Sequence, residues 1–527
     1  MRSTFMGLET AKRGMTTQQT ALYVTGHNIS NANSLGYTRQ SVNFSATSPY
    51  AAPGMNRPGG AGQIGTGVEA GSITRIRESF TDVQFRGQNN KVGYYGSLTE
   101  SLTKMEEIMN EPSESGLQST MEKFWNSLQT LAGNTENIGA RSVVASTGQM
   151  VADTFNYYYN SLTRVQSDIG YQLNTKVTEI NALVSKIDEL NKQISEVEPH
   201  GMLPNDLYDA RDLLVDELSG YVNIKVTKVH PDNYGNALPI AEGLYNIELV
   251  QADGSSFGQP GTTDNYNLLS VTPANGIGAK QEIQVNYTDK LVSGLTVGST
   301  DIAAADFLKT GELSGLIESF GYGDKKGLYP DMLDKLNKLT VTFANEFNEI
   351  HRSGYALNDS NPSNLNFFVF NGADTHPYVD SEGNAAQLIK VNDVLINDQS
   401  KIAAGSEDGN AGNNKNAQIM ADLKTKDFSQ YKTNIPVGLS GNVDSYYAGI
   451  IGSMGVTAQS ANQNYTNSST IAASIEQRRQ STSAVSLDEE MVNMIKFQHA
   501  YNASARNITV VDEMLDKIIN GMGVVGR

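Results

Sequence analysis

Residues 486–523 read SLDEEMVNMIKFQHAYNASARNITVVDEMLDKIINGMG, and this stretch decides the fold. Its apolar and small side chains recur at alternating intervals of three and four residues, the spacing of the core positions of a coiled coil. Ser486, with Glu489 three residues later, has the pattern of a capping box, and Gly521 and Gly523 mark the other end. The positions on the repeat are Leu487, Met491, Met494, Tyr501, Ala505, Ile508, Leu515, Ile519 and Met522, and the polar residues Gln498 and Asp512 interrupt it. The stretch therefore predicts a helix that packs along a narrow seam.

A second helix of this kind is predicted at the opposite end of the chain, over residues 5–29. Neither helix carries enough apolar surface to be stable alone, so each needs a partner. We expect the partner to be the other terminus together with neighbouring copies of the chain. The alternative is a pair of ordinary amphipathic helices on the surface of a globule. The predicted assembly interface consists of Phe5, Leu8, Met15, Leu22, Ile29, Leu487, Met491, Met494, Tyr501, Ile508, Leu515 and Ile519.

Longer helical patterns lie between the two ends. A sustained apolar stripe runs from Leu162 to Val197 and is ended by Pro199 and Gly201. Further helices are predicted at about 90–110, 117–132, 205–219, 330–351 and 441–480. Helices of this length and spacing indicate an elongated bundle.

Most of the strand pattern lies in the middle of the chain. Residues 222–227 and 283–287 alternate apolar and polar side chains, and 245–251 and 268–271 are further short strands. The Asn- and Gly-rich segment 355–440 is predicted as loops with short strands near 367–370 and 386–391.

These patterns predict an α+β multidomain protein with paired N- and C-terminal coiled-coil helices, an elongated helical bundle and inserted antiparallel β domains. We expect a terminal helical domain at 1–35 and 487–527, a helical bundle domain at 36–221, 311–354 and 441–486 with a β-rich segment at 36–85, and outer β-rich domains at 222–310 and 355–440.

Composition excludes several functional classes. The chain has 527 residues, of which 39% are hydrophobic and 18% are charged, so it can bury real cores and is not a charge-driven disordered protein. The net charge of −18 argues against nucleic acid and anionic membrane surfaces as partners. There is no cysteine, no apolar run long enough to insert in a membrane, and no signal-peptide core at the N-terminus.

Motifs for chemistry are weak. The G-x-G-x-x-G match at Gly60–Gly65 lacks a preceding strand and a following helix, so a dinucleotide site is not expected. The six histidines show no metal-ligand spacing, and no nucleophile-elbow motif occurs. We predict no enzyme activity, no catalytic residues, no cofactor and no metal. Asp209, Arg211 and Asp212 fit either a buried ion-pair site or a solvated helix face.

The segment after the first helix carries a familiar signature. Residues 28–40 read NISNANSLGYTRQ and closely resemble the segment N-I-A/S-N-A-N-T-x-G-Y/F of the flagellar rod, hook and hook-associated protein family. The Tyr-Thr-Arg-Gln ending is most similar to hook-associated members at the junction of hook and filament, and Ser34-Leu35 replaces the family's usual Thr-Pro. Asn and Gly tolerate left-handed backbone, so we expect a packed signature joint rather than an exposed loop. The signature joint consists of Asn28, Asn31, Asn33, Gly36, Tyr37 and Arg39.

Other stretches are similar to the same family. They include IGTGV at 64–68 with ITRI at 73–76, PNDLYDARD at 204–212, and FQHAYNASAR at 497–506. The resemblance covers about 1–230, 310–355 and 440–527, and it is specific at both ends of the chain.

The resemblance implies a structural subunit that assembles with copies of itself and joins hook to filament. Its implied partners are the flagellar hook protein, the next hook-associated protein on the filament side, and an export chaperone on the C-terminal region. It also implies an extracellular location in the bacterial flagellum, reached through the flagellar export apparatus without a cleaved signal peptide. The alternatives within the family are the hook protein and another hook-associated protein. Outside the family they are an adhesin and an enzyme acting on glycans or peptides.

Overall fold

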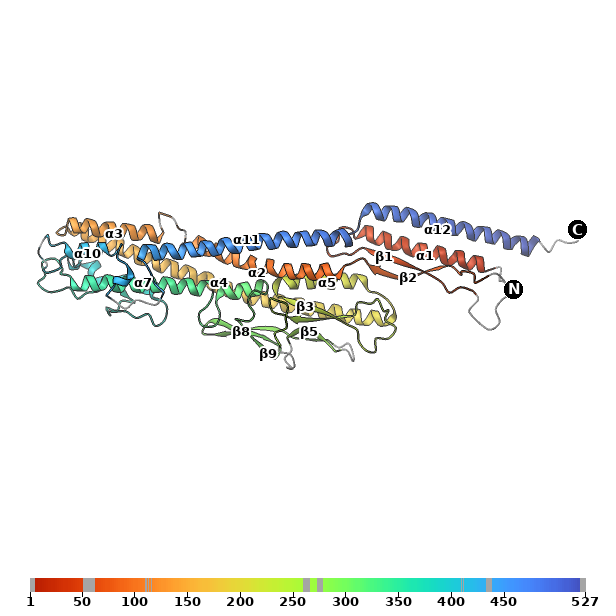
Figure 1. The fold of residues 1–527 in the computed structure, drawn as a ribbon, viewed down its shortest axis with the longest axis horizontal. Coiled ribbons are helices and arrows are strands. Elements are labelled where there is room, and N and C mark those ends of the chain that lie inside the picture. The colour runs from red at the N-terminus through yellow and green to blue at the C-terminus, as the bar shows by residue number, and fades with distance from the viewer. Residues whose placement is uncertain are drawn as a thin grey trace. The chain divides into compact units, whose positions relative to one another are not determined.

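The computed structural model divides the chain into two compact units, each assembled from distant stretches of sequence (Figure 1). It describes residues 5–50, 62–109, 111, 113–114, 116–258, 266–272, 278–408, 410, 412–432 and 438–521. Unit 1 gathers 1–89, 180–282 and 469–527, and unit 2 gathers 90–179 and 283–468. Met522, Gly523 and the start of the Gly60–Gly65 motif lie outside the described residues.

Unit 1 contains both terminal helices, a hairpin and a four-stranded sheet. Its elements are α1 (Met6–Ser30), β1 (Gln40–Ala46), β2 (Val68–Arg75), the start of α2 (Ser79–Met109), the end of α4 (Ile138–Val197), α5 (Asn205–Tyr221), β3 (Ile224–Val229), β4 (Leu244–Leu249), β5 (Asn267–Val271), β6 (Gly278–Lys280), the end of α11 (Val443–Ser483) and α12 (Leu487–Asp516). A 3₁₀ turn (Glu198–His200) follows α4, and a π turn (Lys517–Gly521) follows α12.

The sheets of unit 1 are antiparallel. In the hairpin Gln40 pairs with Arg75, and a bulge shifts the register between Asn43 and Phe44. The other sheet has the order β3-β4-β5-β6. A small core beneath it contains Ile194, Tyr208, Leu244 and Val271.

The two terminal helices run antiparallel, side by side, within unit 1 (Figure 1). The predicted pairing of the two terminal helices is confirmed, because α1 and α12 form the most extensive helix–helix contact of the described elements. The ends of the polypeptide therefore pack together although almost the whole sequence separates them.

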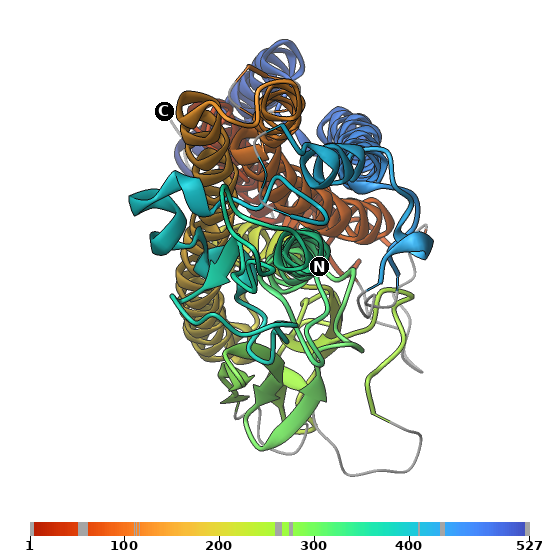
Figure 2. The same cartoon turned by 90° about the vertical axis from the view of Figure 1, so that its left-hand side faces the viewer.

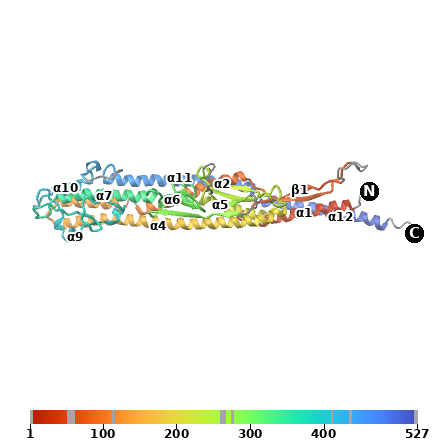
Figure 3. The same ribbon diagram turned by 90° about the horizontal axis from the view of Figure 1, so that it is seen from below.

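Unit 2 is a helical body with small sheets. Its elements are the end of α2, α3 (Leu117–Gly133), the start of α4, β7 (Ile283–Thr288), β8 (Leu291–Val297), β9 (Thr300–Ala303), α6 (Glu312–Phe320), α7 (Leu328–Ser353), β10 (Phe368–Phe370), α8 (Ala385–Leu388), β11 (Ile389–Val391), α9 (Asp393–Asn397), a 3₁₀ turn (Gln399–Lys401), α10 (Lys415–Asp422), a 3₁₀ turn (Phe428–Gln430) and the start of α11. Within unit 2, α4 and α11 lie on opposite sides (Figure 2, Figure 3).

The core of unit 2 is aromatic. Trp125 and Phe124 on α3 are completely buried, and the Trp125 ring meets the Phe343 ring edge-on with centroids 5.8 Å apart. Phe124 also contacts Phe347 and Phe367, which joins the segment after α7 to the helices. Trp125 is therefore a core residue of unit 2.

Asparagines on α7 fix the irregular segment 355–440 against the helices. Asn345 donates to the Tyr378 carbonyl and accepts from the Tyr378 amide, both at 2.9 Å. Asn348 donates to the Phe368 carbonyl at 2.7 Å and accepts from the amides of Phe367 and Phe368. Such two-way pairs satisfy loop backbone that would otherwise be buried without partners.

Several predicted boundaries are wrong. The strands expected in one β domain at 222–310 form two separate sheets, β3–β6 in unit 1 and β7–β9 in unit 2. The β-rich segment expected at 36–85 ends at Arg75, because α2 begins at Ser79. Among its described residues, the segment 355–440 holds one pair of three-residue strands and otherwise short helices and loops, so it is not β-rich. Helix α4 begins at Ile138, well before the predicted stripe.

His351 gives unit 2 a specific acid sensitivity. It is fully buried, its Nδ1 lies 2.8 Å from the Leu365 carbonyl, and its Nε2 accepts from the Ala403 amide at 3.1 Å. Burial lowers the pKa of His351 to about 4, below the ordinary value of 6.5. The unfolded chain therefore binds this proton at a higher pH than the folded chain does.

We predict that the free energy of unfolding of unit 2 is independent of His351 above pH 6.5. It falls by about 1.4 kcal/mol per pH unit as the pH drops from 6.5 toward 4. Urea unfolding followed by fluorescence of Trp125, the single tryptophan, measures this at pH 7.5 and pH 5. His351→Gln should flatten the slope, and an equal slope in the variant would contradict the assignment.

Candidate functional site

Small residues of α1 face α12 at intervals of seven. A side-chain Cβ at Gly7 would lie 3.4 Å from Val511, and one at Gly14 would lie 3.1 Å from Ser504. At the other end Asn28 donates to Glu490 at 3.1 Å. Along these three pairs the residue number rises on α1 by as much as it falls on α12, so the antiparallel register is constant. The same register places the buried Ala21 opposite Phe497. We call these four layers the terminal seam.

The predicted interface residues lie beside the terminal seam rather than in it. Leu8, Met15, Leu22 and Ile29 occupy the neighbouring column of α1 and are half-buried. On α12, Met494, Tyr501, Ile508 and Leu515 are also half-buried, next to the seam column 490, 497, 504 and 511. Phe5, Leu487, Met491 and Ile519 are exposed. The structure therefore brings the two predicted stripes close together but leaves their outer members uncovered.

Asn28 anchors the signature joint. Its amide nitrogen donates to the Gln40 carbonyl at 2.8 Å and to Glu490, and its oxygen accepts from the Gln40 amide and the Tyr37 hydroxyl. These four bonds use the full capacity of a buried carboxamide. The end of α1, the start of β1 and the first turn of α12 are thus tied to one side chain.

Arg39 strengthens the same junction. Its guanidinium donates to Glu490 at 2.8 Å and to Glu489 at 2.6 Å. Ser486 accepts from the Glu489 amide at 3.5 Å, so the predicted N-cap is present, while the Glu489 carboxylate pairs with Arg39. Glu490 is the buried residue of α12, and its charge is compensated by Arg39 and Asn28.

The remaining signature residues differ in their roles. Asn31 donates to the His27 carbonyl at 3.1 Å and closes the C-terminus of α1. Gly36 has a φ of +78°, and a Cβ there would meet the Leu213 side chain at 3.3 Å, so glycine is required twice over. Asn33 is exposed and takes no part in these contacts. Leu35, which lies within the signature segment, is 86% exposed and does not pack in the joint.

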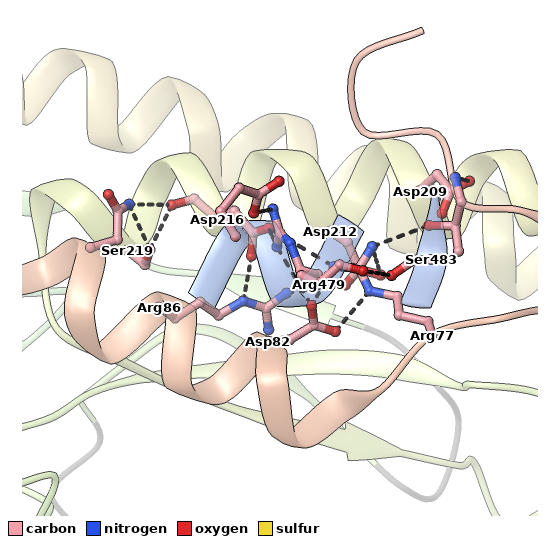
Figure 4. A network of polar contacts seen from close by, with 12 residues as sticks. Arg77, Asp82, Arg86, Asp209, Asp212, Asp216, Ser219, Arg479 and Ser483 are labelled. Atoms are coloured by element: carbon pink, nitrogen blue, oxygen red, sulfur yellow. Dashed lines mark hydrogen bonds and ion pairs between the residues drawn. The ribbon is translucent and has the colours of Figure 1, made fainter. Parts of the chain in front are cut away.

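A buried ion-pair network adjoins the signature joint on α5 (Figure 4). Asp209 accepts from the Thr38 amide at 2.9 Å and from Arg75 at 2.7 Å. Asp212 pairs with Arg75 at 3.0 Å and with Arg86 at 3.2 Å. The reading of this α5 face as solvated is therefore wrong.

Two further carboxylates complete the network. Asp82 accepts from Arg77 through both oxygens, at 2.7 and 3.0 Å. Asp216 accepts from Arg86 at 2.7 Å and also pairs with Arg479 from α11 (Figure 4). The network therefore links the hairpin, α2, α5 and α11 within unit 1.

The charges of this network are strongly coupled. Burial alone would raise the pKa of Asp212, but the guanidinium groups of Arg77, Arg75, Arg86 and Arg211 hold it well below its usual range. Arg211 is itself fully buried, with its guanidinium 3.4 Å from the centroid of the Tyr245 ring. Burial raises the pKa of Asp209 despite its contact with Arg75.

This arrangement fixes the geometry of the elements that it joins in unit 1. A cavity of about 540 Å³ lies beside the network, lined in part by Arg77, Lys225 and Glu242. Its acidic groups are engaged with arginines, which leaves no free pair for acid–base work. In the described parts of the chain no cluster of His, Asp or Glu is placed to hold a metal. Among these residues no helix is long and apolar enough to cross a membrane.

Sequence reasoning missed the partners of the α5 face and the role of Glu490. Arg77, Arg86 and Arg479 are far from α5 in the sequence, and no spacing connects them to it. Glu490 sits in an acidic first turn that appeared to serve helix capping alone. The one available signal was Arg39 in the signature, a charged residue among amides.

We predict that Asp212→Ala destabilises unit 1 by about 3–5 kcal/mol, because it leaves buried guanidinium groups uncompensated. Hydrogen exchange of peptides covering 205–221 measures the loss. Asp206→Ala on the same helix is the control, because its side chain is mostly exposed and should matter by less than about 1 kcal/mol. Equal effects of the two substitutions would contradict the network's role.

We also predict that Glu490→Ala loosens the junction between α12 and the signature joint. Asn28 and Arg39 lose a buried partner, so amide exchange in 487–497 should accelerate at least tenfold while unit 2 stays unchanged. Glu489→Ala is the matched control, since that side chain is largely exposed. Protection that is unaffected by Glu490→Ala would show that the contact is incidental.

Comparison with known proteins agrees with these features. The chain matches the models of the flagellar hook-associated protein FlgK helical domain over 102–368, of the basal body rod FlgEFG protein C-terminal region over 476–521, and of the basal body rod protein over 8–38. The last two matches cover α12 and α1 with most of the signature joint.

Similar full-length proteins share one name. Flagellar hook-associated protein 1 of Bacillus subtilis is 46% identical, with complete coverage of both chains. The protein of that name from Escherichia coli K12 is 25% identical over 97% of this chain and 99% of its own. The flagellar hook junction protein FlgK from Burkholderia pseudomallei has a related fold, with a TM-score of 0.55, 14% identity, and coverage of 76% of this chain and all of that one. The chain therefore belongs to the flagellar hook-associated protein 1 family, structural proteins of the hook–filament junction.

Proposed function

We propose that copies of this chain associate through the outward faces of α1 and α12 and so build the layer that joins hook to filament. The observation that carries the proposal is the poor coverage of α12. Among its described residues one, Glu490, is buried, and many large apolar side chains are exposed. The exposed set from α12 and the following turn is Leu487, Met491, Val492, Ile495, Val510, Met514, Ile518 and Ile519.

The physical reason is the free energy of apolar burial. Covering apolar surface yields about 25 cal/mol per Å², so eight uncovered side chains on one helix represent a large unused driving force. Exposed apolar patches of this kind usually mark interaction sites. The twelve predicted interface residues keep their proposed role between copies, since their half-buried and exposed positions border the terminal seam.

The partners follow from the proposed place in the flagellum. We propose contacts with the hook protein on one side and with the next hook-associated protein on the other. An export chaperone would cover the apolar C-terminal helix before assembly, and the chain would travel through the flagellar export apparatus without a cleaved signal peptide. We also propose that the terminal helices lie innermost in the assembly and the strand-rich parts outermost.

A structural rather than catalytic role completes the proposal. An enzyme or adhesin would place its binding groups in 230–310 or 355–440. In the segment 355–440, polar side chains form hydrogen bonds with the loop backbone, as Asn416 does by donating to the Ala403 carbonyl at 2.7 Å. In the segment 230–310, the carboxylate of Glu242 is paired with Arg75. The groups named here hold the fold together, as a structural role requires.

The test is complementation of cells that lack the gene. The wild-type chain should restore filaments on existing hooks, whereas the double variant Val510→Glu/Met514→Glu should leave bare hooks and accumulate in the medium. Both positions are exposed, so the monomer should fold normally by circular dichroism. Asn502→Glu, an exposed polar position on the same helix, is the control and should restore filaments. Normal filaments with the double variant, or loss of the hook itself without the protein, would contradict the proposal.

A further inference from the structure

A row of exposed apolar side chains follows helix α4 in unit 2. Val143, Met150, Tyr157 and Tyr171 are 52%, 45%, 60% and 73% exposed. They are spaced by seven residues, with Arg164 at the remaining position of the same series. We call this row the α4 ridge.

The spacing of the α4 ridge indicates what covers it. A strict repeat of seven keeps side chains on one line toward a single partner helix, as in coiled coils. From Val143 to Tyr171 the ridge spans 28 residues, which is about 42 Å at 1.5 Å per residue. Its occupant is therefore a helix of comparable length, since a loop or a short helix would leave most of the ridge in water.

The charge of the facing surfaces further limits which helix can cover the α4 ridge. A chain with a net charge of −18 repels its own copies except where the facing surfaces lack net charge. The charged residues around the ridge on the exposed face of α4 are Asp153, Arg164 and Asp168. Their formal charges add up to −1. A partner surface that carries no negative charge would add no repulsion to that of Asp153 and Asp168.

Helix α11 supplies such a surface. Residues 445–468, all within unit 2, contain no Asp, Glu, Lys or Arg. Val456 is 67% exposed, and a Cβ built at Gly449 or Gly452 meets no atom within 4 Å. The outer face of α11 is thus open and uncharged, and residues 445–468 span about 35 Å, most of the length of the α4 ridge.

We propose that the α4 ridge of one copy packs against the outer face of α11 in the next copy. Because α4 and α11 lie on opposite sides of unit 2 (Figure 2, Figure 3), the contact is head-to-tail and repeats from copy to copy. A heterologous contact of this kind generates rings or helical assemblies rather than closed dimers. The inference rests on the proposed assembly and adds a second, lateral interface to the one formed by the terminal helices.

The first experiment introduces charge on the ridge. Tyr157→Glu/Tyr171→Glu is compared with Val379→Glu, which places the same charge at an exposed apolar position elsewhere in unit 2. Both variants should be exported and show wild-type thermal unfolding. The amount retained with purified hooks should fall at least tenfold for the ridge variant and stay unchanged for Val379→Glu. Equal retention of the two variants would overturn the inference.

The second experiment identifies the neighbour by cross-linking, since the natural chain has no cysteine. Tyr157→Cys is combined in turn with cysteine at Gly449, Gly452, Val456 and Ser460, and assembled protein is treated with a thiol cross-linker. Ladders of covalent multimers are expected from double variants and none from Tyr157→Cys alone. Dimers from Tyr157→Cys alone, or no ladder from any pair, would overturn the inference. Absence of wild-type protein from the hook fraction would instead overturn the proposed function.

Discussion

The close antiparallel approach of α1 and α12 is the interaction on which the rest of unit 1 depends. It is possible because the α1 side of the terminal seam is built from Gly7, Gly14 and Ala21, which keep the two backbones near each other. Small residues contribute little apolar burial, so the seam gains its specificity at the Asn28 end. There a saturated carboxamide and an ion pair to Glu490 fix the register. The ion-pair network on α5 then holds the hairpin and α11 in place behind that junction.

The two units differ in how completely their apolar side chains are buried. Unit 2 has a fully buried aromatic core and asparagines that satisfy its loop backbone, so it is stable through its own contacts. The terminal helices of unit 1 bury little and expose many apolar side chains, which leaves surface for the contacts between copies proposed above.

Much of the fold could be predicted from the sequence because periodicity survives without knowledge of partners. The helices, the pairing of the termini and most strands followed from spacing alone. The face of the terminal seam could not be predicted, because large apolar residues such as Leu8 and Met15 mark a buried stripe only when their partner lies in the same chain. The sequence alone does not indicate that Gly7 and Gly14 face another helix, because their neighbours on α12 are distant in the chain. The α5 network could not be decided either, since Arg77 and Arg479 come from distant segments.

An engineered disulfide tests the terminal seam most directly. A Cβ at Gly14 would lie 3.9 Å from that of Ser504, within the range that a disulfide requires. In dilute monomer, Gly14→Cys/Ser504→Cys should form a disulfide within one chain, at a rate independent of protein concentration. A chain that stays reduced, or that forms only concentration-dependent dimers, would contradict the pairing of the two termini within a single copy.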